Sequence, residues 1–460
     1  MATTGTATYE LPGFQGELFY PGDAGYDDAR ALFNGMIDRS PALIARCSSD
    51  DDVVAAVNLA RTQGIALSVF GGGHGVTGSA MVDGGICVDL RGMKGISVDP
   101  KAQTVRAEGG LTWGEFDAAT AEHGLVVTGG RATTTGIAGL ALGSGSGWIE
   151  RKFGFACDNL IEVELVTADG RKVRASETEN AELFWGLRGG GGNFGVVTAF
   201  HFQLHPLPPL ILGGMLIYPA AVGNDLLRFY RAFMLAAPDE VGGGVAFITA
   251  PPAPFVPPEV QGHPVIGIVV SYAGDVDEGA RVFAPLREWG PPAIDLVEPM
   301  PYVAVQQLVE AGFPKGLRNY WTADFYDTLP DKAIDVLVEH ATNPVSPHSQ
   351  MLLIPGGGAI SRVPEDAMAF GQRHAEWNIH YLSMWEQPAD DTKNIEYTRA
   401  ISGAMKPWAS GRVYLNFIGD EGQERVESGF GPETYPRLQA LKKQWDPDNL
   451  FRHNQNIKPA

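Results

Sequence analysis

The sequence is poor in cysteine and in basic residues, and both shortages exclude large classes of protein. Its three cysteines, Cys47, Cys87 and Cys157, form neither a metal-type pair nor an even disulfide set, which is typical of a reducing compartment. Only 34 Lys and Arg stand against 54 acidic residues, so the formal net charge is -20. Because a phosphate backbone requires a basic face, nucleic acid is disfavoured as a partner.

Long apolar runs are also missing. No stretch of 18 apolar residues occurs, and Met1 to Gly22 lacks the basic and apolar regions of a secretory signal. We therefore expect no membrane partner and a soluble cytoplasmic protein, and we expect no metal site. At 460 residues the chain exceeds the usual length of a single core, which favours two lobes.

Glycine, by contrast, is abundant and clustered. The chain has 58 glycines, and one cluster, Gly71 to Gly75, follows a short apolar segment and contains His74. Successive backbone N–H groups in such a loop can hold an anion, although an ordinary tight turn explains the glycines equally well. The imidazole is the informative residue, because a bulky ring is an odd choice among glycines.

A second stretch of small residues runs from Thr133 to Trp148. Its hydroxyl groups can bind phosphate, and its glycine spacing permits close packing either on a planar ligand or between helices. Gly190, Gly192 and Gly195 match the GxGxxG string but follow a predicted helix and precede a predicted strand. That order is the reverse of the dinucleotide fingerprint, so we reject a Rossmann assignment.

The hydrophobic pattern predicts an α+β protein with a boundary at a proline-rich segment. Short strands and helices alternate up to about residue 204, and three prolines then occur within residues 206–209. Beyond them we predict strands over 265–272, 351–354 and 377–385, and helices over 277–289 and 331–341. The tail contains a further predicted helix near 435–442, which we expect to return to the first lobe.

Four ordered blocks carry a resemblance to a known family. They are 70–75, 127–160, 183–195 and the closing segments 414–417 and 446–457. Together these blocks resemble the berberine bridge enzyme-like branch of the vanillyl-alcohol oxidase type (PCMH-type) flavoproteins. The Gly-Gly-Gly-His loop is similar to that of the bacterial hydroxynicotine oxidases.

The resemblance implies a two-lobed PCMH-type fold that binds FAD. Residues 1–206 would form the FAD-binding domain, and 207–410 a substrate domain built on an antiparallel sheet covered by helices. Residues 411–460 would return to the FAD-binding domain.

The resemblance also implies how FAD is held. His74 would bond to the 8α-methyl of the flavin, and this would be the single covalent link, because the second-link cysteine of many relatives is here Ala132. The other implied cofactor contacts are Gly71, Gly72, Gly73, Gly75, Gly130, Thr134, Thr135, Gly136, Gly139, Gly143, Gly145, Asn159, Val196 and Asn454.

The catalytic residues are less clear from the resemblance. Several relatives end a Tyr-x-Asn-Tyr strand with a tyrosine base, and here that position is Phe417, which cannot accept a proton. Tyr414 and Asn416 remain candidates for contact with flavin or substrate. His380, on the predicted strand 377–385, is a candidate base. If the substrate is a neutral amine, hydride transfer needs no strong base.

The leading hypothesis is an FAD-linked oxidase that passes a hydride from a small molecule to flavin and then electrons to O2, releasing H2O2. Gly130, two residues before Ala132, would leave a path for O2. An amine or N-heterocycle and an alcohol or sugar both stay open as substrates. The alternatives are an FAD-linked dehydrogenase, a ring-forming enzyme of secondary metabolism and a non-catalytic flavin-binding protein. A homodimer also stays open.

Overall fold

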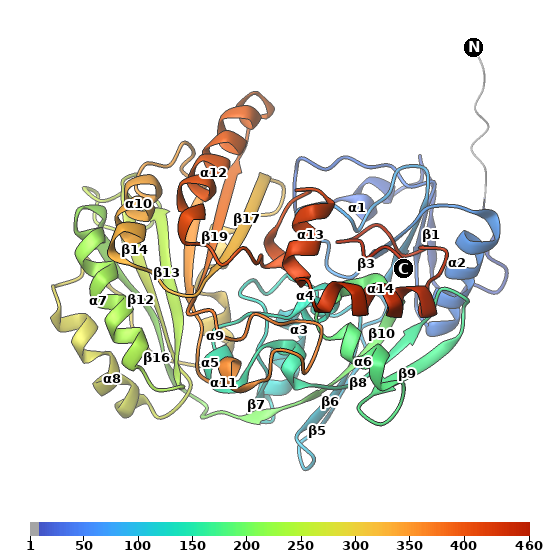
Figure 1. Cartoon of the computed structure of the whole chain (residues 1–460), viewed down its shortest axis with the longest axis horizontal. Coiled ribbons are helices and arrows are strands. Elements are labelled where there is room, and N and C mark those ends of the chain that lie inside the picture. Colours follow the sequence, from blue (N-terminus) through green and yellow to red (C-terminus); the bar gives the residue numbers. More distant parts are fainter. Residues whose placement is uncertain (1–8) are drawn as a thin grey trace.

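The computed structural model describes residues 9–460 as two lobes, so the first eight residues of the predicted first domain lie outside the described part. Figure 1 shows the first lobe on the right and the second, built on one large sheet, on the left. Helices and antiparallel sheets occur together, which confirms the predicted α+β class. None of the described helices is both long and apolar enough to cross a membrane.

The first lobe contains two main sheets. The smaller sheet has the order β1 (Glu17–Phe19), β2 (Leu43–Arg46), β4 (Ile86–Asp89) and β3 (Leu67–Phe70). Strand β4 pairs in parallel with β2 and β3, whereas β1 pairs antiparallel with β2. The larger sheet is antiparallel, in the order β5 (Ile96–Asp99), β6 (Thr104–Glu108), β10 (Val196–Gln203), β8 (Leu160–Val166) and β9 (Lys172–Ser176). Strand β3 ends at the glycine loop that contains His74.

Capping residues fix the ends of two helices of the first lobe. Helix α2 (Asp50–Gln63) ends at Gly64, which adopts φ 64°, and α3 (Trp113–Ala121) begins with a capping box between Thr112 and Glu115. The remaining helices of this part are α1 (Tyr26–Arg30), α4 (Ile137–Gly143), α5 (Glu150–Phe153) and α6 (Ala181–Leu187).

The second lobe begins at Ile211 with an antiparallel sheet. Its order is β15 (Ile294–Asp295), β12 (Ile211–Pro219), β14 (Pro264–Tyr272), β13 (Val241–Thr249), β18 (Gln350–Pro355), β19 (Trp377–Trp385) and β17 (Arg318–Tyr326), and β16 (Glu298–Met300) also pairs with β12. Strand β7 (Leu125–Val126) pairs with the linker strand β11 (His205–Pro206).

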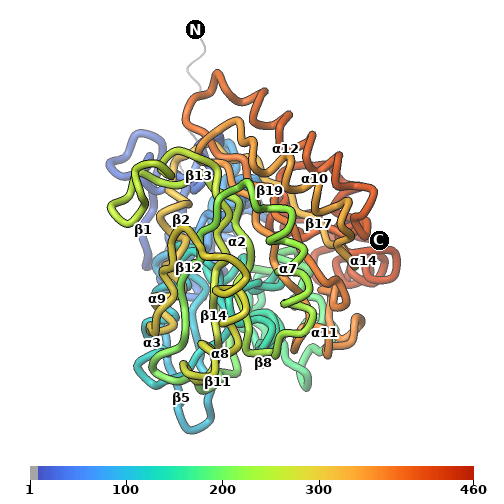
Figure 2. The backbone as a smooth tube through the Cα atoms, turned by 90° about the vertical axis from the view of Figure 1, so that its left-hand side faces the viewer, coloured from blue at the N-terminus to red at the C-terminus, as the bar shows by residue number. Residues whose placement is uncertain are grey.

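Helices cover the outer face of this sheet, and Figure 2 looks onto that layer. They are α7 (Gly223–Ala236), α8 (Val276–Glu288), α10 (Asp331–Ala341) and α12 (Asp391–Met405). In α7 the buried Leu226, Tyr230 and Met234 recur at helical spacing, so one stripe faces the sheet. All nine residues of β19 are buried, because helices cover one face of the strand and the first lobe covers the other.

The C-terminal segment packs against the first lobe. Helices α13 (Gln423–Phe430) and α14 (Thr434–Trp445), red in Figure 1, contribute Val426, Leu438 and Leu441 to the core of that lobe. The segment Leu415–Phe417, which the family pattern places on a strand, forms a 3-10 turn instead. Here the Asn416 amide donates to the Leu140 carbonyl at 3.1 Å, and the chain turns toward the first lobe.

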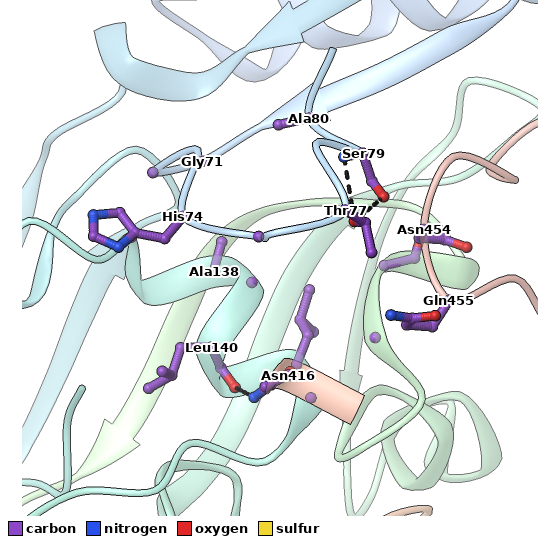
Figure 3. A pocket seen from close by; sticks show the side chains of 18 of the residues that line it. Gly71, His74, Thr77, Ser79, Ala80, Ala138, Leu140, Asn416, Asn454 and Gln455 are labelled. Atoms are coloured by element: carbon purple, nitrogen blue, oxygen red, sulfur yellow. Dashed lines mark hydrogen bonds between the residues drawn. The ribbon is translucent and has the colours of Figure 1, made fainter. Parts of the chain in front are cut away.

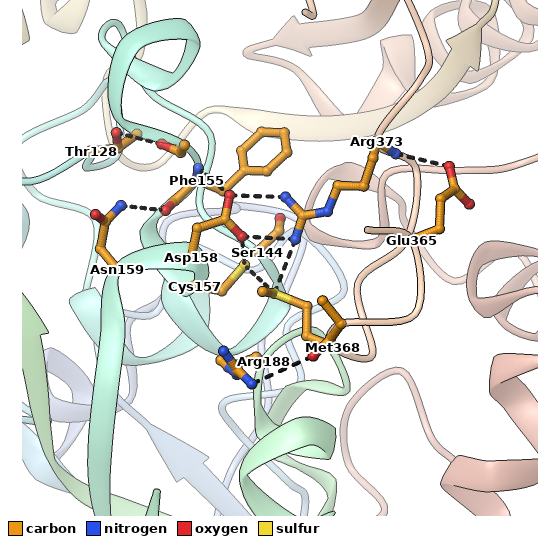
Figure 4. Close-up of polar contacts among 12 residues, drawn as sticks. Thr128, Ser144, Phe155, Cys157, Asp158, Asn159, Arg188, Glu365, Met368 and Arg373 are labelled. Carbon is orange, nitrogen blue, oxygen red and sulfur yellow. Dashed lines mark hydrogen bonds and ion pairs between the residues drawn. The ribbon is translucent and has the colours of Figure 1, made fainter. Parts of the chain in front are cut away.

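A second contact between the lobes comes from the segment before β19. Figure 4 shows Arg373, which is fully buried, donating to both carboxylate oxygens of Asp158 at 2.9 and 2.7 Å. The sulfur of buried Cys157 lies 3.6 Å from that of Met368. Because a buried charge without its partner is costly, this bidentate pair holds the lobes in one arrangement.

Candidate cofactor and active site

A large cavity of about 340 Å³ opens where the two lobes and the C-terminal segment meet. The first lobe contributes the loop after β3, the residues around α4 and the loop before β10, and Figure 3 shows the C-terminal segment on the opposite side. The second lobe contributes Val309, Phe313, Trp321 and Leu352. Residues separated by more than 300 positions in the sequence therefore share one wall.

His74 projects from the glycine loop into this cavity and is held from three sides. Its Nε2 lies 2.9 Å from the Thr134 hydroxyl, and its Nδ1 lies 3.3 Å from the Thr135 hydroxyl. Its ring stacks on Phe33 at a centroid distance of 4.5 Å. Burial, with a contribution from nearby Lys315, lowers the pKa of His74 to about 4. The imidazole is thus neutral at pH 7, with a nitrogen lone pair available.

Some glycines of the cavity wall leave room that no protein atom uses. A Cβ added at Gly75, Gly139 or Gly192 would meet nothing within 4 Å, although all three residues line the cavity. Packing of the protein on itself therefore gives no reason for glycine at these positions. A bound molecule that approaches the backbone closely would give a reason for glycine there, and a nucleotide cofactor requires such an approach.

Other glycines are needed by the fold itself. A Cβ at Gly72 would lie 2.2 Å from the Gly136 nitrogen, and a Cβ at Gly136 would lie 2.4 Å from the Gly72 nitrogen. These two glycines let the His74 loop and the start of α4 touch backbone to backbone. A Cβ at Gly143 would fall 1.9 Å from the Asn416 Oδ1, so this glycine admits the C-terminal turn.

One end of the cavity is rich in hydrogen-bonding groups. Thr77 and Ser79 follow the His74 loop and bond to each other, and Figure 3 shows them across the cavity from Asn454 and Gln455. The Asn454 amide donates to the Gly192 carbonyl at 3.2 Å. The C-terminal segment therefore fixes the glycine loop Gly189–Gly195 at this end.

A fully buried ion pair reinforces that contact. Lys442 Nζ donates to Asp446 at 2.7 Å, to the Asn193 carbonyl at 2.7 Å and to the Phe451 carbonyl at 2.8 Å. All three ammonium hydrogens are thus used, and the pair joins α14 to the glycine loop.

The opposite end is apolar and aromatic. Trp321 stacks on Phe417 at 5.6 Å, while Phe33 and Phe313 present their edges to Trp321 at 5.8 and 6.3 Å. No Asp, Glu or Lys is among the described residues that line the cavity, and Arg131 is the charged one. Arg131 pairs with the buried Glu150 at 3.3 Å, so it does not present a free positive charge. This end suits a flat apolar molecule.

Most of the predicted site residues meet at this cavity. The lining includes His74, Thr135, Val196, Asn416, Asn454 and the predicted glycines except Gly145. Thr134 reaches the site through its bond to His74. Gly145 does not line the cavity, because its backbone packs on Ala156.

Asn159 also lies away from the cavity. Its amide donates to the carbonyls of Phe153 and Phe155 at 2.9 and 2.8 Å, and its oxygen contacts His205, so its polar atoms have protein partners. These contacts shape the turn before β8, and they do not support the predicted contact with the cofactor.

Of the three proposed catalytic residues, only Asn416 lines the large cavity, while His380 and Tyr414 line a different, small cavity of about 20 Å³. The Tyr414 hydroxyl bonds to Ser144 and to the Ser146 amide, and the His380 ring lies 4.1 Å from that of Phe417. Burial lowers the pKa of His380 well below its usual value, so it is neutral. Phe417 stands between this histidine and the large cavity, which leaves His380 without direct access to a substrate there.

Several lining residues escaped sequence reasoning. Thr77 and Ser79 carried a signal, since hydroxyl residues directly after a glycine loop are suited to a phosphate. The aromatic residues Phe33 and Phe313 carried none, because they are distant in sequence and resemble core residues.

Comparison with known proteins also indicates an FAD-binding protein, and the matches extend over nearly the whole chain. Residues 41–176 match a family described as FAD binding domain, and 413–458 match one described as berberine and berberine like. The (R)-6-hydroxynicotine oxidase of Paenarthrobacter nicotinovorans is 33% identical over 459 residues, which cover 97% of each chain.

Solved structures agree. The crystal structure of 6-hydroxy-D-nicotine oxidase from Arthrobacter nicotinovorans superposes with a TM-score of 0.87 at 30% identity and covers 100% of both chains. A BBE-like protein of Physcomitrella patens gives a TM-score of 0.87 at 24% identity, over 98% of both chains. At that identity the second likeness shows the fold alone.

Proposed function

The chain belongs to the berberine bridge enzyme-like branch of the vanillyl-alcohol oxidase type FAD-linked oxidoreductases, and from this membership we propose an oxidase of a small apolar amine or N-heterocycle. When bound, FAD would supply the redox chemistry, namely a two-electron acceptor for a hydride from the substrate that O2 can reoxidise with release of H2O2. The observation that carries the proposal is the large cavity, with a glycine-lined, hydroxyl-rich end and an aromatic end joined at His74.

The residues of the cavity fit FAD. Gly75, Gly139 and Gly192 leave unused space along the wall, and Thr77 and Ser79 supply hydroxyl groups for a diphosphate. The apolar end accommodates a flat ring system beside the aromatic residues.

His74 is the proposed site of a single covalent link to the flavin. A new C–N bond requires an unprotonated nitrogen, and burial keeps this imidazole neutral. Thr134 and Thr135 orient the ring, so that one nitrogen bonds to the flavin while the other keeps a hydroxyl partner. Ala132 offers no thiol for a second link.

The proposed substrate class is supported by the aromatic end of the cavity, where Phe33, Phe313, Trp321 and Phe417 offer no group that could take a proton. Phe417 cannot take a proton, and His380 lies behind it in the small cavity. An alcohol or sugar would require proton removal and several polar partners, whereas a neutral amine transfers its hydride without a base. The relative named as a hydroxynicotine oxidase supports an N-heterocyclic amine.

The covalent link is tested by denaturing the purified protein in acid and measuring the mass of the chain and the absorbance of the pellet. We expect flavin to stay with the wild-type chain and to leave the His74→Ala chain. Flavin that remains on His74→Ala would disprove the assignment, and a Thr134→Ala variant serves as a control that keeps the nucleophile.

The oxidase activity is tested with a panel of tertiary and secondary amines, hydroxylated N-heterocycles and oligosaccharides under air. We expect flavin bleaching and stoichiometric H2O2 with amines. Anaerobic reduction that air fails to reverse would identify a dehydrogenase, and flavin that no compound bleaches would identify a binding protein.

A further inference from the structure

A buried polar cluster joins the two lobes directly behind the wall of the large cavity. Asp117 on α3 is 3% exposed, while Tyr302 and Gln306 on α9 (Tyr302–Gln307) are 5% and 1% exposed. Helix α3 packs against α9, so these side chains face one another across the lobe boundary. None of them lines the cavity.

One side chain of this cluster connects it to the cavity wall. The Gln306 amide donates one hydrogen to Asp117 Oδ2 at 3.0 Å and the other to the Gly130 carbonyl at 3.1 Å. Gly130 lines the cavity, and no other hydrogen bond to its carbonyl occurs in the described part of the chain. A buried carbonyl needs a partner, and Gln306 provides it.

Gly130 is also packed closely against the side chains of Trp113 and Leu140. A Cβ added there would come within 3.1 Å of the Trp113 ring and 3.3 Å of Leu140, so the peptide is confined on that side as well. At Ala132, two residues later, the chain has no side chain that could anchor this segment covalently. The position of the Gly130 peptide therefore depends on packing and on Gln306.

The cluster is incompletely satisfied, which is unusual for buried polar groups. Asp117 Oδ1, Gln306 Oε1 and the Tyr302 hydroxyl have no hydrogen-bond partner among the described residues. The ionisable groups that act on Tyr302 are Asp117, Arg131 and Glu150, and the last two pair with each other. Burying two apolar side chains in place of Asp117 and Gln306 would cost less free energy. A carboxyl group at this position therefore indicates a role other than stability.

We propose that Gln306 and Asp117 are positioning residues for the flavin site: Gln306 fixes the Gly130 peptide at the cavity wall, and the protonation state of Asp117 sets how firmly it does so. A protonated carboxyl group carries a donor hydrogen that a carboxylate lacks, and Asp117 Oδ1, which no described donor contacts, can hold it. An ionised carboxylate removes that donor and leaves a charge without a cationic partner. The position of Gly130 then changes with pH.

Burial raises the pKa of Asp117 to about 7, which puts this change in the physiological range. The inference rests on the proposed flavin site, because the flavin reports on the Gly130 peptide. It does not depend on the identity of the substrate.

The test is a pH titration of the visible absorbance of the purified holoprotein between pH 5 and 9, without substrate. We expect a sigmoidal change with a midpoint near 7 in the wild type. Asp117→Asn, which mimics the protonated carboxyl group, should lose the transition and resemble the wild type at low pH. Gln306→Met should also lose it.

The matched control is Glu122→Gln, an exposed carboxyl group just after the same helix, which should titrate like the wild type. A transition that persists in Asp117→Asn, or a wild-type spectrum that does not change with pH, would overturn the inference while leaving the proposed function intact. Purified protein without flavin would overturn both.

Discussion

Replacing Lys442 by Met is the sharpest test of how the C-terminal segment holds the site. The Lys442–Asp446 pair is fully buried, and its ammonium also bonds to the carbonyls of Asn193 and Phe451. The variant leaves the Asp446 carboxylate buried with only two backbone N–H donors, from Leu450 and Phe451. Removing one partner of a buried ion pair costs about 3–5 kcal/mol, because the remaining charge is uncompensated.

The loss would be measured by urea unfolding followed by tryptophan fluorescence. Lys393→Met is the control, since Lys393 pairs with Asp390 on the surface and such pairs contribute less than about 1 kcal/mol. The double variant Lys442→Met/Asp446→Asn removes the stranded charge and should recover part of the stability. If Lys442→Met lost less than about 1 kcal/mol, the argument that this pair fastens α14 to the glycine loop would be wrong.

Three further predictions concern the site. Asp117→Asn should gain stability over the wild type only as pH rises. The folded state holds the Asp117 proton more tightly than the unfolded chain, so wild-type stability falls from about pH 4 to about pH 7, by at most about 4 kcal/mol for a pKa raised from 3.8 to about 7. Urea midpoints at pH 4 and pH 8 measure the gain, and an equal gain at both pH values would contradict the prediction. Gly139→Val should lower the flavin content of the purified protein, because its side chain enters the space left for the cofactor, whereas Gly403→Val on α12, which also meets nothing within 4 Å, should not. With an amine substrate, kcat/KM should rise about tenfold per pH unit below the pKa of the amine and level off above it, because the aromatic end offers no base; a separate ionisation well below that pKa would point to a base in the protein.

Local features of the fold could be predicted from the sequence. The strand Trp377–Trp385 and the helix Asp331–Ala341 have the predicted bounds, because alternation of apolar residues or helical spacing determines them within one segment. Helix α2 ends at Gly64 for an equally local reason, since a glycine there can adopt a positive φ.

The candidate site could be predicted only in part. His74 stood out because its neighbours are glycines, but which glycines touch the protein and which leave space for a ligand depends on contacts across the fold, as Gly72 and Gly139 show. Period-two alternation along β19 puts Asn378 and His380 on one face, and both line the small cavity. It could not show that Phe417, which arrives from the C-terminal segment, separates His380 from the large cavity.

The return of the C-terminal segment has a consequence for biosynthesis. A ribosome releases the His74 loop long before it makes Lys442, Asp446 and Asn454, which complete the polar end of the cavity. Domains fold in order of their emergence, so the wall of the first lobe stays incomplete until residues 411–460 have left the ribosome. The cavity can therefore enclose a bound molecule on all sides only after this segment has been synthesised.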